Sequence, residues 1–203
     1  MPLIGDHAPE FHAMTTQGKI DFPADYKGSW VVLFSHPADF TPVCTTEFIA
    51  LSRMKETFES LNTKLIGLSI DSLHSHLGWI KSIEALNFNN EGKVKIPFPI
   101  IADISMNVAR KYGMLQTVAN TQSVRAVFII DPEGMIRTIL YYPMSTGRNI
   151  PEIIRILQSL QLNDKTHYST PANWQPGDAV VMGAPLKIEE AQERLESSDN
   201  TIE

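Results

Sequence analysis

The chain has 203 residues, of which 43% are hydrophobic and 20% are charged, and its formal net charge is −6. This length and composition are typical of a globular protein that can bury a sizeable core without a disulfide or a metal ion. The negative charge argues against nucleic-acid binding and against electrostatic docking on anionic membranes.

Cys44 is the single cysteine of the sequence, which excludes an intrachain disulfide, a CxxC redox pair and a cysteine-rich zinc site. The segment 1–6 has no basic region followed by an apolar stretch, so it does not resemble a signal peptide. The apolar runs are far shorter than a membrane span. We therefore expect a cytoplasmic protein that uses no cofactor or metal and binds neither nucleic acid nor membrane.

The first half of the chain alternates between apolar runs and amphipathic segments. Residues 30–34 form a continuous apolar run, which predicts a buried strand. From residue 48, apolar side chains recur at steps of three and four, which predicts a helix over 48–61. A second buried strand is expected at 65–70, and Asp71-Ser72 then offers a cap for a helix over 73–86. We expect His74 and His76 of that helix to lie at the surface, since residues two apart on a helix diverge.

The second half continues the alternation. Its predicted elements are a short helix at 106–112 closed by Gly113, a buried strand at 126–130, a turn at 131–134, a hairpin strand at 135–141 and a helix at 151–160. Buried strands that alternate with amphipathic helices indicate an α/β sandwich with a mixed central sheet.

The composition changes after residue 163, so we divide the chain into a main domain, 1–163, and a C-terminal arm, 164–203. The stretch 170–177 is rich in turn residues around Trp174, and a short helix is expected at 185–195. Because Trp174 and the apolar stretch 179–182 would be exposed on an isolated main domain, we expect the arm to pack against a second subunit. The alternative is that the arm folds back on its own subunit.

The lone cysteine follows a set of helix-start signals. Thr41 suits the N-cap position and Pro42 the first helical position, which places Cys44 third in the first turn. Free backbone N–H groups and the positive end of the helix dipole favour a thiolate there, and the thiolate is the nucleophilic form of the side chain. The alternative is an inert, buried cysteine. A phosphatase loop is excluded, because no arginine occurs in 45–50.

The pattern Pro37-x-x-x-Thr41-x-x-Cys44 resembles the active-site signature of peroxiredoxins, and the longer string 35–47 resembles their one-cysteine, peroxiredoxin-6 type. Further stretches similar to that family lie at 68–72, 97–101, 127–132, 142–149 and 170–178. The resemblance covers nearly the whole chain. It implies a thioredoxin-like fold with a C-terminal arm that packs in a homodimer, which in relatives can assemble further into a ring of dimers.

The resemblance also implies roles for individual residues. Cys44 corresponds to the peroxidatic nucleophile, Thr41 to the hydroxyl that contacts the peroxide, and Arg125 to the arginine beside the thiolate. The supporting positions are those of Pro37, which shields the site from water, of His36, which lines the pocket, and of Glu47 and Arg148, which belong to a charged network.

The resemblance thus implies a thiol peroxidase that reduces hydrogen peroxide and organic hydroperoxides through a sulfenic acid on Cys44. With one cysteine per chain, an external thiol or another donor must reduce that sulfenic acid. Two alternatives remain open: a redox-regulated chaperone or peroxide sensor that uses the same thiol, and an inert scaffold.

Overall fold

The computed structural model describes residues 1–115, 123–183 and 187–189. The chain divides into two compact units, residues 1–150 and 151–203.

A seven-stranded mixed sheet forms the centre of the first unit, with the strand order β2-β1-β5-β4-β3-β6-β7. Strands β3, β4 and β5 run parallel, and the remaining pairings are antiparallel. The strands are β1 (Phe11–Thr15), β2 (Gly18–Phe22), β3 (Trp30–Ser35), β4 (Thr63–Ser69), β5 (Ile100–Ala102), β6 (Arg125–Ile130) and β7 (Ile136–Tyr142). The predicted strands at 30–34, 65–70, 126–130 and 135–141 are confirmed, and β1, β2 and β5 are additional.

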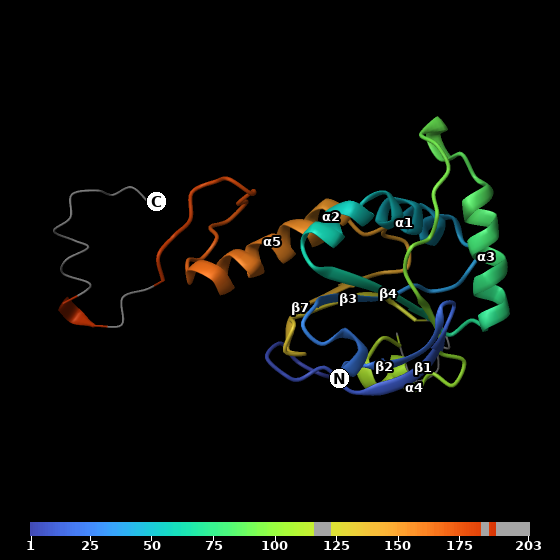
Figure 1. Ribbon diagram of the computed structural model, residues 1–203, viewed down its shortest axis with the longest axis horizontal. Helices are drawn as coiled ribbons and strands as arrows, with labels where there is room; N and C mark the ends of the chain where they lie inside the picture. The colour runs from blue at the N-terminus through green and yellow to red at the C-terminus, as the bar shows by residue number, and fades with distance from the viewer. Residues whose placement is uncertain (116–122, 184–186, 190–203) are drawn as a thin grey trace. The chain divides into compact units, whose positions relative to one another are not determined.

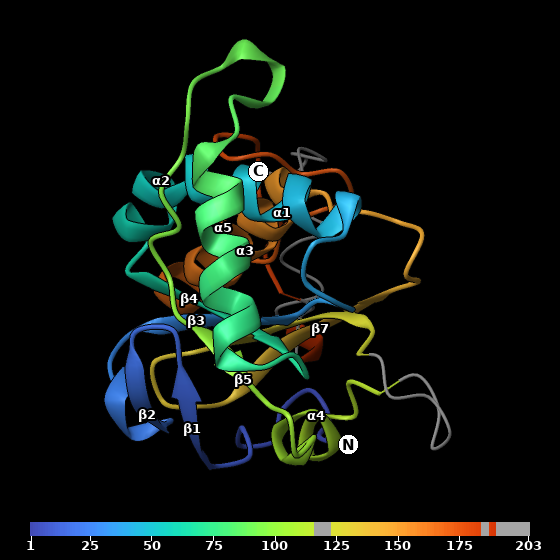
Figure 2. The same cartoon turned by 90° about the vertical axis from the view of Figure 1, so that its right-hand side faces the viewer.

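Helices cover both faces of this sheet. Helices α1 (Pro42–Arg53) and α2 (Lys55–Ser60) lie on one side of the central strands, and α4 (Asn107–Tyr112) lies on the other (Figures 1 and 2). Helix α3 (Leu73–Ala85) begins after the N-cap Ser72, whose hydroxyl accepts a hydrogen bond from the Ser75 N–H. Short 3-10 helices occur at Ala24–Tyr26 and Phe88–Asn90.

The single helix predicted over 48–61 is wrong in one respect, because the chain breaks at Met54 into α1 and α2. The backbone of Met54 has φ −92° and ψ 11°, and its N–H reaches back to several carbonyls at the end of α1. The change of direction lets α2 bury Phe58, which is fully packed, while its neighbours Lys55 and Glu59 stay exposed.

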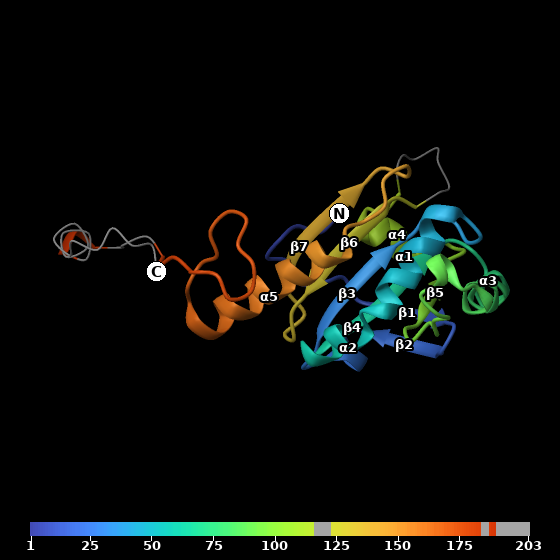
Figure 3. The ribbon, with the colours of Figure 1, turned by 90° about the horizontal axis from the view of Figure 1, so that it is seen from above.

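Strands β3 and β6 are buried at every position, as expected for the middle of a two-faced sheet. Between the sheet and α1, an aromatic cluster of Phe34, Phe48 and Phe98 packs together, and Trp79 of α3 joins it at a centroid distance of 4.6 Å from Phe48. Viewed from above, α1 runs beside β3 (Figure 3). The aromatic cluster therefore anchors the helix that carries Cys44.

The second unit opens with helix α5 (Ile150–Thr166), which begins at the unit boundary. We predicted that Trp174 is buried against another subunit, but its side chain is only 5% exposed in this single chain. The turn around it closes on itself, since the Trp174 indole donates to the Asp178 carbonyl at 3.1 Å. Trp174 therefore needs no partner to cover it. The helix expected at 185–195 lies almost entirely outside the described residues.

Among the described residues, no helix is both long enough and apolar enough to span a bilayer.

Candidate active site

Cys44 occupies the first turn of α1, as the sequence predicts. Thr41 is the N-cap residue with an extended backbone, Pro42 opens the helix, and Cys44 follows in the third helical position. The Thr41 hydroxyl does not cap the helix, because it donates to the Ala38 carbonyl at 2.9 Å. The Cys44 side chain is buried, with no exposed surface. A thiol in this position receives the field of the helix N-terminus without screening by water.

Arg125 opens β6 and places its guanidinium beside the sulfur. Its Nη1 lies 3.2 Å from the Cys44 Sγ and 2.7 Å from the Glu47 Oε2. Its Nε and Nη2 donate to the Met144 carbonyl at 3.1 and 3.0 Å. Arg125 is buried, and these contacts fix its plane, so one donor stays aimed at the sulfur.

Glu47 lies one turn after Cys44 and joins two arginines. Its Oε2 accepts from Arg125 at 2.7 Å and from the Nη2 of Arg148 at 2.6 Å, and its Oε1 accepts from the Arg148 backbone N–H and Nε. Arg148 also donates to the carbonyls of Ser35 and Ala126. All three charged side chains are buried.

The charges of the three side chains in this network do not cancel. Two guanidinium groups face one carboxylate, which leaves one positive charge in excess inside the protein. A buried charge is costly unless it is paired. The Cys44 sulfur lies 3.2 Å from a guanidinium nitrogen of this network. The excess positive charge therefore lies beside the sulfur.

His36 belongs to a separate hydrogen-bonded group. Its Nε2 lies 2.9 Å from the Asp39 Oδ1, and its ring packs on Phe48 and Trp79. Burial lowers the pKa of His36, although the hydrogen bond with Asp39 opposes that shift. The Nδ1 of His36 is buried and has no partner among the described residues. Pro37 follows His36 in the chain and is also buried.

The surface position predicted for His76 is wrong. Its ring is fully buried, with Nδ1 2.8 Å from the Asp39 Oδ2 and Nε2 3.2 Å from the Ile101 carbonyl oxygen. Both nitrogens therefore face hydrogen-bond acceptors. The spacing of His76, Trp79 and Ile83 along one helical face, all buried, is the signal that could have placed this histidine in the core. His74 is exposed, as predicted.

Burial would raise the pKa of Asp39, but the hydrogen bonds from His36 and His76 outweigh it and lower the pKa overall. Within the described residues, these three side chains are also the group whose ligand atoms lie close enough to hold a metal ion, all within 4.8 Å of one another. The carboxylate of Asp39 lies within hydrogen-bond distance of both rings. The group is therefore a buried hydrogen-bond network that links the loop before α1 to α3.

Comparisons with known proteins agree with this geometry. Residues 4–139 match the model of the AhpC/TSA family, and residues 159–198 match the C-terminal domain of 1-Cys peroxiredoxin. A peroxiredoxin of Methanosarcina mazei is 60% identical over 197 residues, which are 96% of this chain and 90% of that protein.

Two solved structures are also similar. A cysteine-to-serine mutant of peroxiredoxin 6 from Arenicola marina is 38% identical with a TM-score of 0.85, over 95% of this chain and 89% of that one. A yeast mitochondrial 1-Cys peroxiredoxin is 41% identical with a TM-score of 0.86, over 100% and 97% of the two chains. The thiol-resolving mechanism of that yeast protein runs via glutathione and thioredoxin systems.

A thioredoxin-like sheet that holds one thiol at a helix N-terminus, under a buried guanidinium, defines a thiol peroxidase. The expectation of a mixed α/β sandwich with a C-terminal extension is confirmed. The chain belongs to the peroxiredoxins of the AhpC/TSA family and carries the C-terminal domain of their 1-Cys members.

Proposed function

We propose that this peroxiredoxin reduces hydrogen peroxide and organic hydroperoxides, with Cys44 as the nucleophile and an external thiol as the reductant. The observation that carries the proposal is the 3.2 Å contact between the Arg125 Nη1 and the Cys44 Sγ at the start of α1. It supplies a cation beside the sulfur where the helix dipole also favours negative charge.

In the first step the thiolate sulfur attacks one peroxide oxygen. The S–O bond forms, the O–O bond breaks, and the leaving oxygen departs as hydroxide or alkoxide, which takes a proton to become water or alcohol. Negative charge moves from the sulfur to the leaving oxygen. Four of the five N–H donors of Arg125 bind Cys44, Glu47 and Met144, and within the described residues one on Nη2 is left, so the guanidinium can stabilise charge at both ends of the displacement.

The remaining site residues support this step. The Thr41 hydroxyl gives its proton to Ala38, so its oxygen lone pairs are left to accept a hydrogen bond from the peroxide O–H. Glu47 and Arg148 hold Arg125 in place. In this proposal Pro37 shields the site from water, and His36 lines the pocket.

The sulfenic acid is then reduced from outside the chain, since the sequence has no second cysteine. A thiol attacks the sulfenic sulfur, water leaves and a mixed disulfide forms. A second thiol releases Cys44 and becomes part of an external disulfide. The thiol systems named for the yeast relative, glutathione and thioredoxin, are the candidates to test first.

The deciding experiment mixes reduced protein with hydrogen peroxide in a stopped-flow instrument and follows tryptophan fluorescence. Trp79 is a built-in reporter, because its indole donates to the Thr45 hydroxyl, next to Cys44, at 3.2 Å. We expect a fast second-order change that is absent in Cys44→Ser. A rate no higher than that of a free thiol would contradict the proposal. Repeated turnover with glutathione or thioredoxin, rather than a single oxidation, would distinguish an enzyme from a sensor or chaperone.

We further propose that the chain forms a homodimer through the arm 164–203 and that it acts in the cytoplasm. The match of residues 159–198 to a family-specific C-terminal domain and the exposure of Met182 and Ile188 support a dimer arm. Sedimentation equilibrium of the full chain tests it. A concentration-independent monomer would contradict it.

A further inference from the structure

We propose that the first half of β4 is a docking site for an extended peptide segment of another protein, which adds to the sheet as a strand and carries an acidic side chain opposite Lys64. The site lies between α2 and the β1–β2 hairpin. The proposal does not depend on Cys44 or on the peroxidase reaction.

The first observation is a set of unpaired backbone groups on β4. The Trp30 N–H donates to the Asn62 carbonyl at 3.0 Å in the parallel β3–β4 ladder. Backbone groups alternate in direction along a strand, so those of Thr63 and Leu65 point away from β3. On that side β5 pairs with β4 only from Gly67 onward. The Gly67 N–H donates to the Pro99 carbonyl at 2.9 Å.

Proline explains why β5 cannot continue this ladder. The next bond would run from the N–H of residue 99 to the Leu65 carbonyl, and Pro99 has no N–H. Within the described part of the chain, the backbone N–H and C=O of Thr63 and Leu65 have no hydrogen-bond partner. These groups form a short unpaired edge on β4, a strand that has neighbours on both sides in the rest of its length. Such an edge is a template for the addition of another strand.

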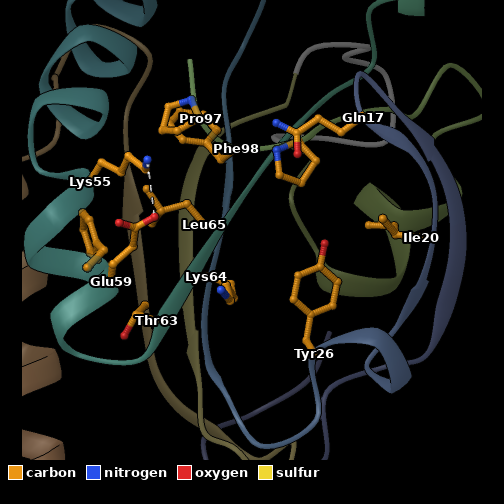
Figure 4. A pocket seen from close by; sticks show the side chains of 12 residues that line it. Gln17, Ile20, Tyr26, Lys55, Glu59, Thr63, Lys64, Leu65, Pro97 and Phe98 are labelled. Carbon is orange, nitrogen blue, oxygen red and sulfur yellow. Dashed lines mark ion pairs between the residues drawn. The ribbon is translucent and has the colours of Figure 1, made fainter. Parts of the chain in front are cut away.

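The second observation is a pocket of about 330 Å³ along this edge. In Figure 4, Lys55 and Glu59 of α2 lie on one side of the β4 residues Thr63–Leu65, and Ile20 and Tyr26 lie on the other. Side chains therefore line the pocket on both faces of the sheet. This arrangement fits an added strand, because the side chains of a strand alternate between the two faces.

The lining also sets the chemistry of the peptide. On the α2 side, Phe58, Leu65 and Phe98 offer apolar contact to every second side chain. On the other side, Lys64 is exposed and has no carboxylate partner among the described residues, whereas Lys55 is paired with Glu59 at 3.6 Å. A peptide that alternates apolar residues with an acidic one matches both sides, because its carboxylate would pair with the free ammonium of Lys64.

The test uses the full chain and a defined probe, the acetylated and amidated peptide Val-Asp-Val-Thr-Val. Its binding is measured by calorimetry, and its position is measured by hydrogen exchange at single amides. We expect binding, and we expect exchange of the Thr63 and Leu65 amides to slow by about tenfold or more, because both N–H groups gain a partner. The same peptide with N-methylated valines should not bind, since it lacks the backbone donors.

Two exposed lysines provide matched variants. Lys64→Glu should weaken binding of the aspartate peptide by about tenfold, because attraction becomes repulsion. Lys81→Glu on α3 changes the net charge equally but lies outside the pocket lining, so it should leave binding unchanged. No binding at millimolar peptide, binding without protection of Thr63 and Leu65, or equal binding of the N-methylated peptide would each overturn the proposal.

Discussion

The guanidinium of Arg125 contacts the sulfur of Cys44 at 3.2 Å, although the two residues are 81 positions apart in the chain. The contact follows from the sheet, because β3 and β6 pair antiparallel with Phe34 opposite Val127. That register brings the start of β6 beside the end of β3. The chain leaves β3 there and enters α1, so the topology sets a cation over the first turn of the helix that carries the thiol.

Replacing Arg125 with lysine should slow the reaction of Cys44 with hydrogen peroxide. Lysine keeps the charge but lacks the planar fork that donates to Cys44, Glu47 and Met144 together. We expect the second-order rate constant from stopped-flow fluorescence to fall by about 100-fold, as for loss of one aligned donor in an active site. The matched control Arg110→Lys, on the exposed surface of α4, should react like the wild type. Equal rate constants for the two variants would show that Arg125 does not take part in the reaction.

Glu47→Gln should lower the stability of the protein. The substitution leaves the buried guanidinium groups of Arg125 and Arg148 without their carboxylate. Breaking a buried ion pair from one side costs about 3–5 kcal/mol, which urea unfolding would measure as a lower free energy of unfolding. Glu59→Gln, at an exposed position of α2, should change it by less than about 0.5 kcal/mol. Similar values for the two variants would show that the network contributes little to stability.

The His36–Asp39–His76 group predicts a loss of stability in mild acid. Burial lowers the pKa of His36 below 6.5, so the unfolded chain takes up a proton there before the folded chain does. The free energy of unfolding should therefore fall as the pH drops below about 6.5, by at most about 1.4 kcal/mol per pH unit for one proton. The contribution of Asp39, whose pKa is lowered, is present above 3.8 and is lost in stronger acid.

Urea unfolding between pH 7 and pH 5 checks the histidine part. The slope of stability against pH should be smaller in His36→Asn than in the wild type. His74→Asn, at an exposed position of the same helix as His76, should keep the wild-type slope. A slope in His36→Asn equal to that of the wild type would assign the acid sensitivity to other groups.

Excess peroxide without a reductant should drive Cys44 beyond the sulfenic acid. With no second cysteine in the chain, nothing internal captures that intermediate. Intact-mass spectrometry should show a gain of about 32 Da or more, for sulfinic or sulfonic acid, located on Cys44 by peptide mapping. Pre-equilibration with thioredoxin and its reducing system should prevent this gain. A Cys44 that remains a free thiol would contradict the peroxidase mechanism.

The sequence predicted the helix start and the strands around the site, because neighbouring residues in the chain determine them. Thr41 and Pro42 start α1 as expected, and long apolar runs such as 30–34 form the buried strands. Strands β1 and β2 were missed because each has five residues of mixed polarity, and β5 was missed because its three residues are too few for a period to stand out. The break at Met54 was missed because tertiary packing of Phe58, and no breaker residue, ends α1 there.

The sequence by itself therefore determined that one thiol lies at a helix N-terminus and that no second thiol of the chain can resolve it. The tertiary structure decided which charges surround that thiol, since the contacts of Arg125, Glu47 and Arg148 depend on strand register across distant parts of the chain. It also decided that His76 is buried with Asp39 and that Leu65 lies on an unpaired edge. Helix starts follow from neighbouring residues, whereas side-chain pairing and strand edges follow from topology, which only the folded chain specifies.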